Sequence, residues 1–255
     1  MNRKLPAFSL IALLVVFTSC QKETSIDGNP TTPITPTGHL KWYIEDGSQT
    51  PLNYVDSFNV TYDNSNRLTG LVSQQVSFLY SYGSGPYAGV DLYVGGNLQI
   101  HETDYLNSAG LIDTSLQYND TNDTTTEKYV YGPSGPSRLT TYDYTTALVT
   151  VYSVDDYHYD GNGDMVMDVQ SDGSATVQYI TTYTYTTYLN VVPIVPGFVP
   201  TRGKHLPATA TETDGTGNPV DAVTYTYQFD SQNRLIRETD VSQAGGTLVK
   251  KFVYQ

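Results

Sequence analysis

Beyond residue 20, the chain alternates polar and apolar side chains in short runs that are separated by turns rich in Asp, Asn and Gly. Residues 58–62 alternate, residues 63–66 form a polar break, and the alternation then resumes. Residues 224–229 and 230–233 repeat this arrangement. A run of period two, a polar turn and a second such run are typical of a β-hairpin. No stretch after residue 20 has helical periodicity, so the sequence predicts an all-β fold of consecutive antiparallel hairpins.

The composition favours strands and excludes one class of partner. The chain contains 23 Tyr, a residue that suits pleated, half-buried surfaces. It has 26 Asp and Glu against 13 Lys and Arg, which gives a formal net charge of −13. Nucleic acids bind basic surfaces, so we expect no nucleic-acid partner. Cys20 is the only cysteine, so no internal disulfide can form, and strand pairing and packing must hold the fold together.

The first 19 residues have the layout of a bacterial export signal. Arg3 and Lys4 precede a mostly apolar stretch over residues 5–17, which is shorter than the ~20 residues of a transmembrane helix. Residues 17–20, Phe-Thr-Ser-Cys, resemble a lipobox, in which the peptidase cuts before a lipid-carrying cysteine. We therefore expect residues 1–19 to be a lipoprotein signal peptide. Lipid on Cys20 would then anchor the protein to the outer membrane, on its periplasmic or its surface-exposed side.

Residues 20–38 form the next predicted segment, a tether rich in Pro and Thr. Pro30, Pro33 and Pro36 are separated by pairs of residues that contain Thr, which favours an extended linker. Residues 39–255 then form the predicted β-repeat domain. Four further prolines between residues 191 and 207 disfavour a central strand and predict a long loop there.

One motif recurs along the predicted domain. Residues 62–68 and 229–235 share an aromatic residue followed by Asp, then Asn, Arg and Leu, and residues 159–165 are a looser copy. Asp would cap the turn, Asn or Gly would adopt the left-handed conformation, and Arg would pair with the Asp or stack on a neighbouring ring. The residues to which we assign these structural roles are Asp63, Asn66, Arg67, Asp160, Gly163, Asp230, Asn233 and Arg234.

The motif resembles the YD repeats of the Rhs family and of related β-rich lipoproteins of Bacteroidetes. In that family such repeats form hairpins that add to a long, curled antiparallel sheet. The resemblance therefore implies a curled repeat sheet over residues 39–255. It implies an architecture and no activity.

Four tyrosines are the candidate ligand-binding residues. Tyr183 and Tyr185 share one face of a predicted strand, and Tyr225 and Tyr227 share a face of another. Exposed tyrosine rings can stack on sugar rings, whereas buried ones form a cross-strand ladder that stabilises a sheet. The ladder is the favoured interpretation, and a glycan or an envelope protein is the partner that an exposed face would suit.

No linear pattern of catalytic residues stands out, so we expect no cofactor, no metal site and no catalytic residue. Asp160-x-Asn162-x-Asp164 has the spacing of half a calcium loop, but a hairpin turn is favoured there. The leading hypothesis is a lipid-anchored β-repeat protein that binds or acts as a scaffold without catalysis. Two alternatives stay open. One is an exported glycan hydrolase that uses paired carboxylates such as Glu102, Asp104 or Asp168, and the other is a purely structural envelope protein.

Overall fold

A computed structural model describes most of the predicted domain. The described residues are 39–119, 124–145, 148–190, 194, 196, 198–199 and 203–255. The predicted signal peptide over residues 1–19, Cys20 and the tether up to residue 38 lie outside the described residues. Within the described part of the chain, no helix is long and apolar enough to span a membrane.

The described residues form sixteen β-strands, each antiparallel to the strand before it. The prediction of an all-β chain of consecutive antiparallel strands is confirmed. The strands are β1 (Leu40–Gln49), β2 (Val55–Tyr62), β3 (Leu68–Val72), β4 (Val76–Tyr82), β5 (Tyr87–Val94), β6 (Asn97–Leu106), β7 (Ile112–Asn119), β8 (Thr124–Tyr131), β9 (Pro136–Thr145), β10 (Leu148–Tyr159), β11 (Met165–Asp172), β12 (Val177–Leu189), β13 (His205–Asp214), β14 (Pro219–Phe229), β15 (Leu235–Ser242) and β16 (Gly246–Tyr254).

The strands close into a barrel because β1 pairs with β16. Tyr43 lies opposite Phe252, and Glu45 lies opposite Lys250. The expected curled repeat sheet is therefore wrong. A curled sheet leaves the first and last strands as free edges, whereas here those two edges satisfy each other's backbone hydrogen bonds.

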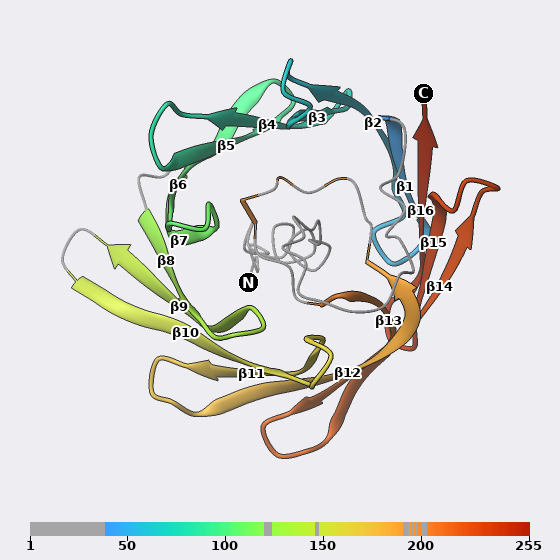
Figure 1. Cartoon of the computed structure of the whole chain (residues 1–255). Coiled ribbons are helices and arrows are strands. Elements are labelled where there is room, and N and C mark those ends of the chain that lie inside the picture. Colours follow the sequence, from blue (N-terminus) through green and yellow to red (C-terminus); the bar gives the residue numbers. More distant parts are fainter. Residues whose placement is uncertain are drawn as a thin grey trace, which may run out of the picture.

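The two ends of the barrel differ in width (Figure 1). Seen along the axis, the turns β6–β7, β8–β9 and β10–β11 lie towards the centre of the ring, whereas the turns β11–β12 and β13–β14 splay outward. We call the end where odd-numbered strands begin the narrow end, and the opposite end the wide end. The chain enters β1 and leaves β16 at the narrow end, where the backbone N–H of Gln255 donates to the carbonyl of His39 (2.9 Å).

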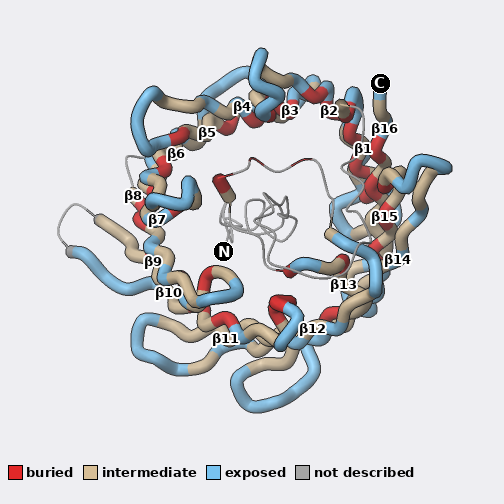
Figure 2. The backbone as a smooth tube through the Cα atoms, viewed as in Figure 1, coloured by how far each residue is buried: buried red, intermediate tan, exposed pale blue. Residues whose placement is uncertain are grey.

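Part of the connection between β12 and β13 lies inside the ring (Figures 1 and 2). Ile194 packs in a buried cluster that includes Phe58, and Phe198 packs against Ile112. The N–H of Ile112 also donates to the carbonyl of Phe198 (3.0 Å). The sheet face that carries these clusters is therefore the inner wall. Since side chains alternate along a strand, the register then assigns the other strand residues to the inner or the outer wall.

The predicted loop over residues 191–207 ends sooner than expected, because β13 already begins at His205. Pro207 lies within β13, opposite Tyr185, beside a register irregularity between Thr184 and Tyr185. A proline, which lacks the N–H of a ladder hydrogen bond, is tolerated at such an irregularity.

Six turns between strands share one hydrogen-bonding pattern. In each, the side-chain oxygen of an Asp or Asn accepts the N–H groups two and four residues further on, at 2.8–3.2 Å. The residue three positions on has a positive φ, as at Asn66 (62°), Gly163 (88°) and Asn233 (58°). The first residues of the six turns are Asp63, Asn107, Asp160, Asp172, Asp214 and Asp230.

The arginine of the repeated motif joins its turn to a later strand. Arg67 Nε donates to Asp63 Oδ2 (2.7 Å), and its guanidinium lies 4.2 Å from the ring centre of Tyr82. The Tyr82 hydroxyl donates to the carbonyl of Leu68, at the start of β3 (2.8 Å). The other good copy has the same contacts, made by Asp230, Arg234, Tyr254 and Leu235.

Candidate functional site

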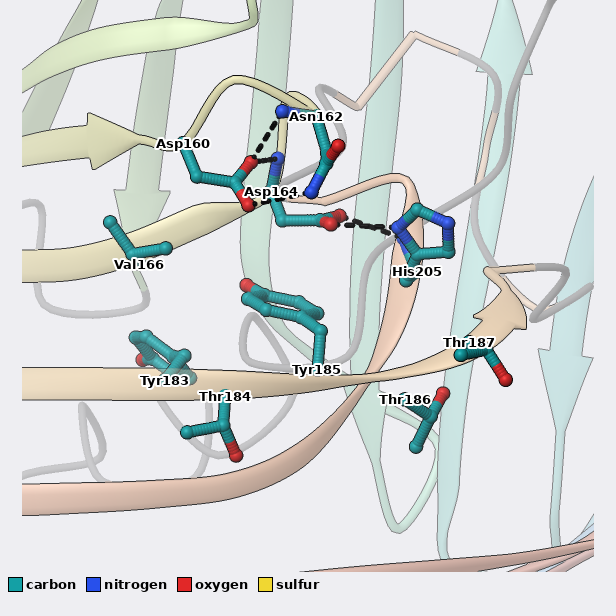
Figure 3. A pocket seen from close by; sticks show the side chains of 10 residues that line it. All are labelled: Asp160, Asn162, Asp164, Val166, Tyr183, Thr184, Tyr185, Thr186, Thr187 and His205. Carbon is teal, nitrogen blue, oxygen red and sulfur yellow. Dashed lines mark hydrogen bonds and ion pairs between the residues drawn. The ribbon is translucent and has the colours of Figure 1, made fainter.

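A hollow of about 500 Å³ opens at the narrow end, between the β10–β11 turn, β12 and the start of β13 (Figure 3). Figure 3 shows the rings of Tyr183 and Tyr185 rising from β12 towards the turn that carries Asp160. The residues that line the hollow are Asp160, Asn162, Asp164, Val166, Tyr183, Thr184, Tyr185, Thr186, Thr187 and His205. The lining thus combines two aromatic rings with hydroxyl, amide and carboxylate groups.

Asp160 shapes the turn above the hollow. Its Oδ1 accepts the N–H groups of Asn162 and Asp164 (both 2.9 Å), and its Oδ2 accepts the Asn162 side-chain amide (3.1 Å). These bonds, led by that from the N–H of Asp164, lower the pKa of Asp160. The carboxylate is thus engaged by the turn. Among the described residues, no group of three or more His, Cys, Asp and Glu side chains could hold a metal ion.

Asp164 ties the β10–β11 turn to the start of β13. Its side chain is 2% exposed. Its Oδ1 accepts the N–H groups of Lys204 (2.7 Å) and His205 (2.8 Å), and its Oδ2 lies 2.7 Å from Nδ1 of His205. Three donors thus satisfy a buried carboxylate and fix the imidazole at the rim of the hollow.

Sequence reasoning did not assign a site role to Asp164 or His205. One signal was present, because Asp164 occupies the position that holds Arg67 and Arg234 in the two good copies of the motif. Here Asp replaces the Arg of the motif, and this turn contacts His205 where the two good copies contact a tyrosine ring.

The structure brings two of the four predicted tyrosines to the hollow. Tyr183 and Tyr185 line it, and the hydroxyl of Tyr185 donates to the carbonyl of Met165 (2.6 Å). Tyr225 and Tyr227 lie on the inner wall of β14, outside the lining, and the hydroxyl of Tyr227 donates to the carbonyl of Pro207 (2.8 Å). Burial raises the pKa of Tyr185, Tyr225 and Tyr227, so these hydroxyls stay neutral donors.

The predicted carboxylate pair lies elsewhere on the inner wall. Glu102 and Asp104 are neighbours on β6, and Asp168 lies on β11, so none of the three lines the hollow. Asp104 is fully buried. Burial raises its pKa to about 6, and burial together with the charge of Asp104 raises the pKa of Glu102. Glu102 and Asp104 lie close together because residues two apart on a strand point to the same face of the sheet.

A second charged group lies on the inner wall beside the β1–β16 closure. Lys250 Nζ is 2.7 Å from both Glu238 Oε1 and Asp240 Oδ2, and its side chain is 1% exposed. On β1, which pairs with β16, Tyr43 donates its hydroxyl to Glu45, two residues along the same strand. Burial alone would lower the pKa of Lys250, but the two carboxylates raise it above its ordinary value. Two carboxylates thus compensate one buried ammonium group.

The comparisons with known families and with curated proteins give no match. Among solved structures, the chain is similar to a porin-like protein from Bacteroides uniformis, with a TM-score of 0.61 and 14% identity, over 86% of this chain and 98% of that one. It is also similar to a porin-like protein from Bacteroides vulgatus, with a TM-score of 0.61 and 12% identity, over 86% and 99% of the chains. This chain therefore shares the barrel fold of these two proteins. The resemblance to YD repeats is therefore corrected: the repeated turns belong to a closed barrel of sixteen strands.

Proposed function

We propose that this protein is a lipid-anchored component of the bacterial outer membrane whose barrel stands in water, and that it acts by binding and not by catalysis. The lipobox-like segment ending at Cys20 supports the anchor. The porin-like fold supports a place in the envelope. The observation that carries the proposal is the set of polar pairs and threonines that interrupt the apolar residues of the outer wall, among them Trp42, Leu79 and Val253. A wall that faced lipid would need a continuous apolar band.

Two polar pairs lie on the outer wall, one in the middle of β5 and β6 and one near the narrow end of β9 and β10. Asp91 in β5 and His101 in β6 lie opposite each other, with 2.6 Å between Oδ1 and Nδ1. Arg138 in β9 donates to both oxygens of Asp156 in β10, at 2.6 and 2.9 Å. A basic side chain on the lipid face costs about 2–4 kcal/mol at the bilayer midplane and about 0–1 kcal/mol near the interfaces, so Arg138 near the strand end weighs little and the Asp91–His101 pair in mid-strand is the one that favours an aqueous surrounding.

Threonines occupy much of the outer wall between β12 and β15. Thr184, Thr209 and Thr224 form one row across three strands. In the neighbouring row, Thr182 lies opposite Thr211. The hydroxyls of Thr184 and Thr209 are 2.7 Å apart. The hydroxyl groups of this wall are solvated by water, and they interrupt its apolar residues, such as the exposed Val241 opposite Thr224.

Two neighbouring strands are short for a bilayer. β3 has 5 residues and β4 has 7. A strand rises about 3.3 Å per residue, so β3 spans roughly 17 Å even without tilt. The apolar band of membrane barrels is about 25 Å tall. This part of the wall therefore also favours a barrel outside the bilayer.

The location is tested by replacing residues 1–20 with a cleavable secretory signal that leaves no lipid-accepting cysteine. The intact protein is expected in the detergent-rich phase of a detergent phase separation, because its lipid partitions there. The variant is expected in the aqueous phase, and it should stay soluble without detergent. A variant that remains in the detergent-rich phase would contradict the proposal.

The competing function is that of a membrane pore, which the description of the neighbouring structures as porin-like favours. Reconstitution of the purified intact protein into planar bilayers separates the two. We expect no stepwise conductance. Reproducible conductance steps together with detergent-phase partitioning would establish the pore instead.

The hollow at the narrow end is the proposed ligand site, because it presents two tyrosine rings beside the amide and carboxylate groups of the β10–β11 turn, a combination that suits a sugar. A glycan-array screen of the intact protein tests this. Tyr183→Ala should abolish binding to any glycan that the wild type retains. Tyr179→Ala is the matched control, because Tyr179 lies on the same face of β12 but outside the lining. Equal loss in both variants would contradict the assignment.

A further inference from the structure

His205 is the histidine of the hollow, and one of its two ring nitrogens is engaged by the protein. Its Nδ1 lies 2.7 Å from Oδ2 of Asp164, on the side of the ring that faces the β10–β11 turn (Figure 3). The side chain of Asp164 is 2% exposed, whereas that of His205 is 27% exposed. The ring edge that carries Nδ1 is therefore covered, and the opposite edge, with Nε2, is the part that a ligand reaches.

Asp164 decides which nitrogen of His205 carries the proton. Its Oδ1 accepts the backbone N–H groups of Lys204 (2.7 Å) and His205 (2.8 Å), as an ionised carboxylate does. Since an ionised carboxylate can only accept, its hydrogen bond with the imidazole requires a proton on Nδ1. Nε2 of the neutral ring is then a bare acceptor, and no group of the described residues donates to it.

The chain around this pair is shaped to hold it. A Cβ at Gly203 would lie 3.0 Å from Cε1 of Tyr185 and 3.2 Å from Oδ1 of Asp164. The segment that leads into β13 thus passes this close because residue 203 has no side chain. The hydroxyl of Tyr185 in turn donates to the carbonyl of Met165, at the start of β11 (2.6 Å). These contacts give the Nε2 acceptor of His205 a fixed position at the rim of the hollow.

The hollow is negatively charged. Its lining includes the carboxylates of Asp160 and Asp164 and no Lys or Arg side chain. The side chain of Asp160 accepts from two backbone N–H groups and from the amide of Asn162, all of them neutral, so its charge stays uncompensated. Lys204 lies across the turn, with Nζ 3.5 Å from the place of a Cβ on Gly163, but outside the lining. One lysine against two carboxylates leaves the site negative.

We propose that His205 selects the ligand of this hollow, and that the ligand is a neutral sugar whose hydroxyl donates to Nε2. The inference rests on the proposed function, because it takes the hollow to be a glycan site. A sugar hydroxyl supplies the proton that a bare Nε2 needs. A uronic acid also has hydroxyls, but its carboxylate meets the charges of Asp160 and Asp164, and like charges repel. The site therefore accepts neutral hexoses and excludes their uronic acids.

Matched pairs of probes test the selection by charge. Tetrasaccharides of glucose, galactose and mannose differ from those of glucuronate, galacturonate and mannuronate only at C6, which carries a hydroxyl or a carboxylate. Isothermal titration calorimetry with the intact protein at low ionic strength should show binding of at least one neutral probe, with a Kd at least about fivefold below that of its uronate. A uronate that binds as tightly as its neutral partner would overturn the inference and leave the hollow a glycan site. If no probe binds, the inference and the glycan site fall together, and the partitioning experiment still decides the location.

A turn variant assigns the discrimination to Asp160. Asp160→Asn removes the charge and keeps the turn, because Asn107 makes the same two hydrogen bonds in the β6–β7 turn (2.9 and 3.2 Å). It should reduce the preference for the neutral probe about threefold. Asp214→Asn is the matched control, because Asp214 makes the same bonds in a turn at the wide end, outside the lining. Equal changes in both variants would overturn the selection by charge.

A histidine variant tests the acceptor. His205→Asn keeps an N–H donor for Asp164, because the side-chain amide takes the place of Nδ1, but it removes Nε2. It should raise the Kd of the best neutral probe about three- to tenfold. His101→Asn is the control, because His101 has a similar contact with Asp91 on the outer wall, and it should leave the Kd unchanged. Equal effects would contradict the role of His205.

Nitrogen NMR of the wild type, with labelled histidine side chains, gives a readout that a purely structural role would not move. At pH 8, well above the ordinary histidine pKa of about 6.5, the ring proton of His205 should reside on Nδ1 in the free protein. The Nε2 resonance should then shift when the best neutral probe is added. A proton on Nε2 in the free protein, or an Nε2 resonance unchanged by binding, would overturn the proposal even if His205→Asn does not fold.

Discussion

At the scale of single residues, the six similar turns differ at the position with positive φ. Gly or Asn occupies this position in five of them, and Ala175 (φ 60°) occupies it in the β11–β12 turn. The left-handed conformation costs an L-residue with a Cβ roughly 1–2 kcal/mol, whereas Gly adopts it freely. Ala175 is therefore a strained residue in an otherwise standard turn.

We predict that Ala175→Gly stabilises the protein by about 1 kcal/mol, because relief of the strained φ outweighs the greater freedom of glycine in the unfolded chain. The matched reverse change is Gly217→Ala in the β13–β14 turn, where φ is 87° and a Cβ would meet nothing within 4 Å. It should destabilise the protein by about 1 kcal/mol. Urea unfolding of both variants checks this, and a loss of stability in Ala175→Gly would refute it.

A second prediction at this scale concerns pH. Burial raises the pKa of Asp104 from 3.8 to about 6, so the folded state takes up a proton more readily than the unfolded state. The ionised form therefore destabilises the fold above pH 6, and the penalty disappears as the pH falls towards 4. Asp104→Asn should be more stable than the wild type at pH 8, by up to about 3 kcal/mol, and equal to it near pH 4. Thermal unfolding across this range measures the difference, and a gap independent of pH would argue against a buried, ionised Asp104.

At the scale of strands, Lys250 connects β16 to the two carboxylates of β15. Lys250→Met should destabilise the protein by about 3–5 kcal/mol at pH 8, because it leaves Glu238 and Asp240 buried without a counter-ion. The loss should shrink at pH 5.5, since the carboxylates of the variant can then bind protons in the folded state. Lys251→Met is the control, because Lys251 lies on the outer wall of the same strand and should change stability by less than about 0.5 kcal/mol. Similar losses in both variants, measured by urea unfolding, would show that the network adds nothing specific.

The individual strands and turns were predictable because their signals are local. The alternating runs around residues 58–68 and 224–235 became β2–β3 and β14–β15, and the Asp-led turns lie between them. The candidate site was predictable only in part. Tyr183, Tyr185 and Asp160 could be singled out along the chain, whereas the contact of Asp164 with His205 joins residues 41 positions apart. Nothing in the local pattern of either residue identifies the other as its partner.

At the scale of the whole molecule, the closure of the barrel could not be read from the sequence. The local pattern of hairpins is the same in an open curled sheet and in a closed ring. What distinguishes them is the pairing of β1 with β16, which joins the two ends of the described chain. The interior position of Ile194 and Phe198 depends on the same closure, because a segment can be enclosed only by a complete wall.

Because consecutive strands form a closed ring, we predict that the chain ends can be moved to another turn without changing the fold. A permutant that joins residue 255 to residue 39 through a short flexible linker, and opens the chain between Gly95 and Gly96, should fold to a barrel. The two glycines form a turn with positive φ at the wide end, and a Cβ at either would meet nothing within 4 Å. We expect a Tm within a few degrees of that of the protein starting at residue 39. A second permutant, opened in the β8–β9 turn between Gly132 and Gly135, is the comparison. If it folds and the first does not, the β5–β6 turn must stay intact for folding, and the prediction is wrong.

The pairing of the first strand with the last also sets the order of assembly. Neighbouring strands can pair as soon as both are available, but β1 must wait for β16, with almost the whole domain between them. Until then both strands present unpaired N–H and C=O groups, which are templates for pairing with other chains. Contacts so distant in sequence form slowly. The fold that leaves no edge in its finished state therefore exposes two strand edges for longest during folding, and aggregation is the hazard of this interval.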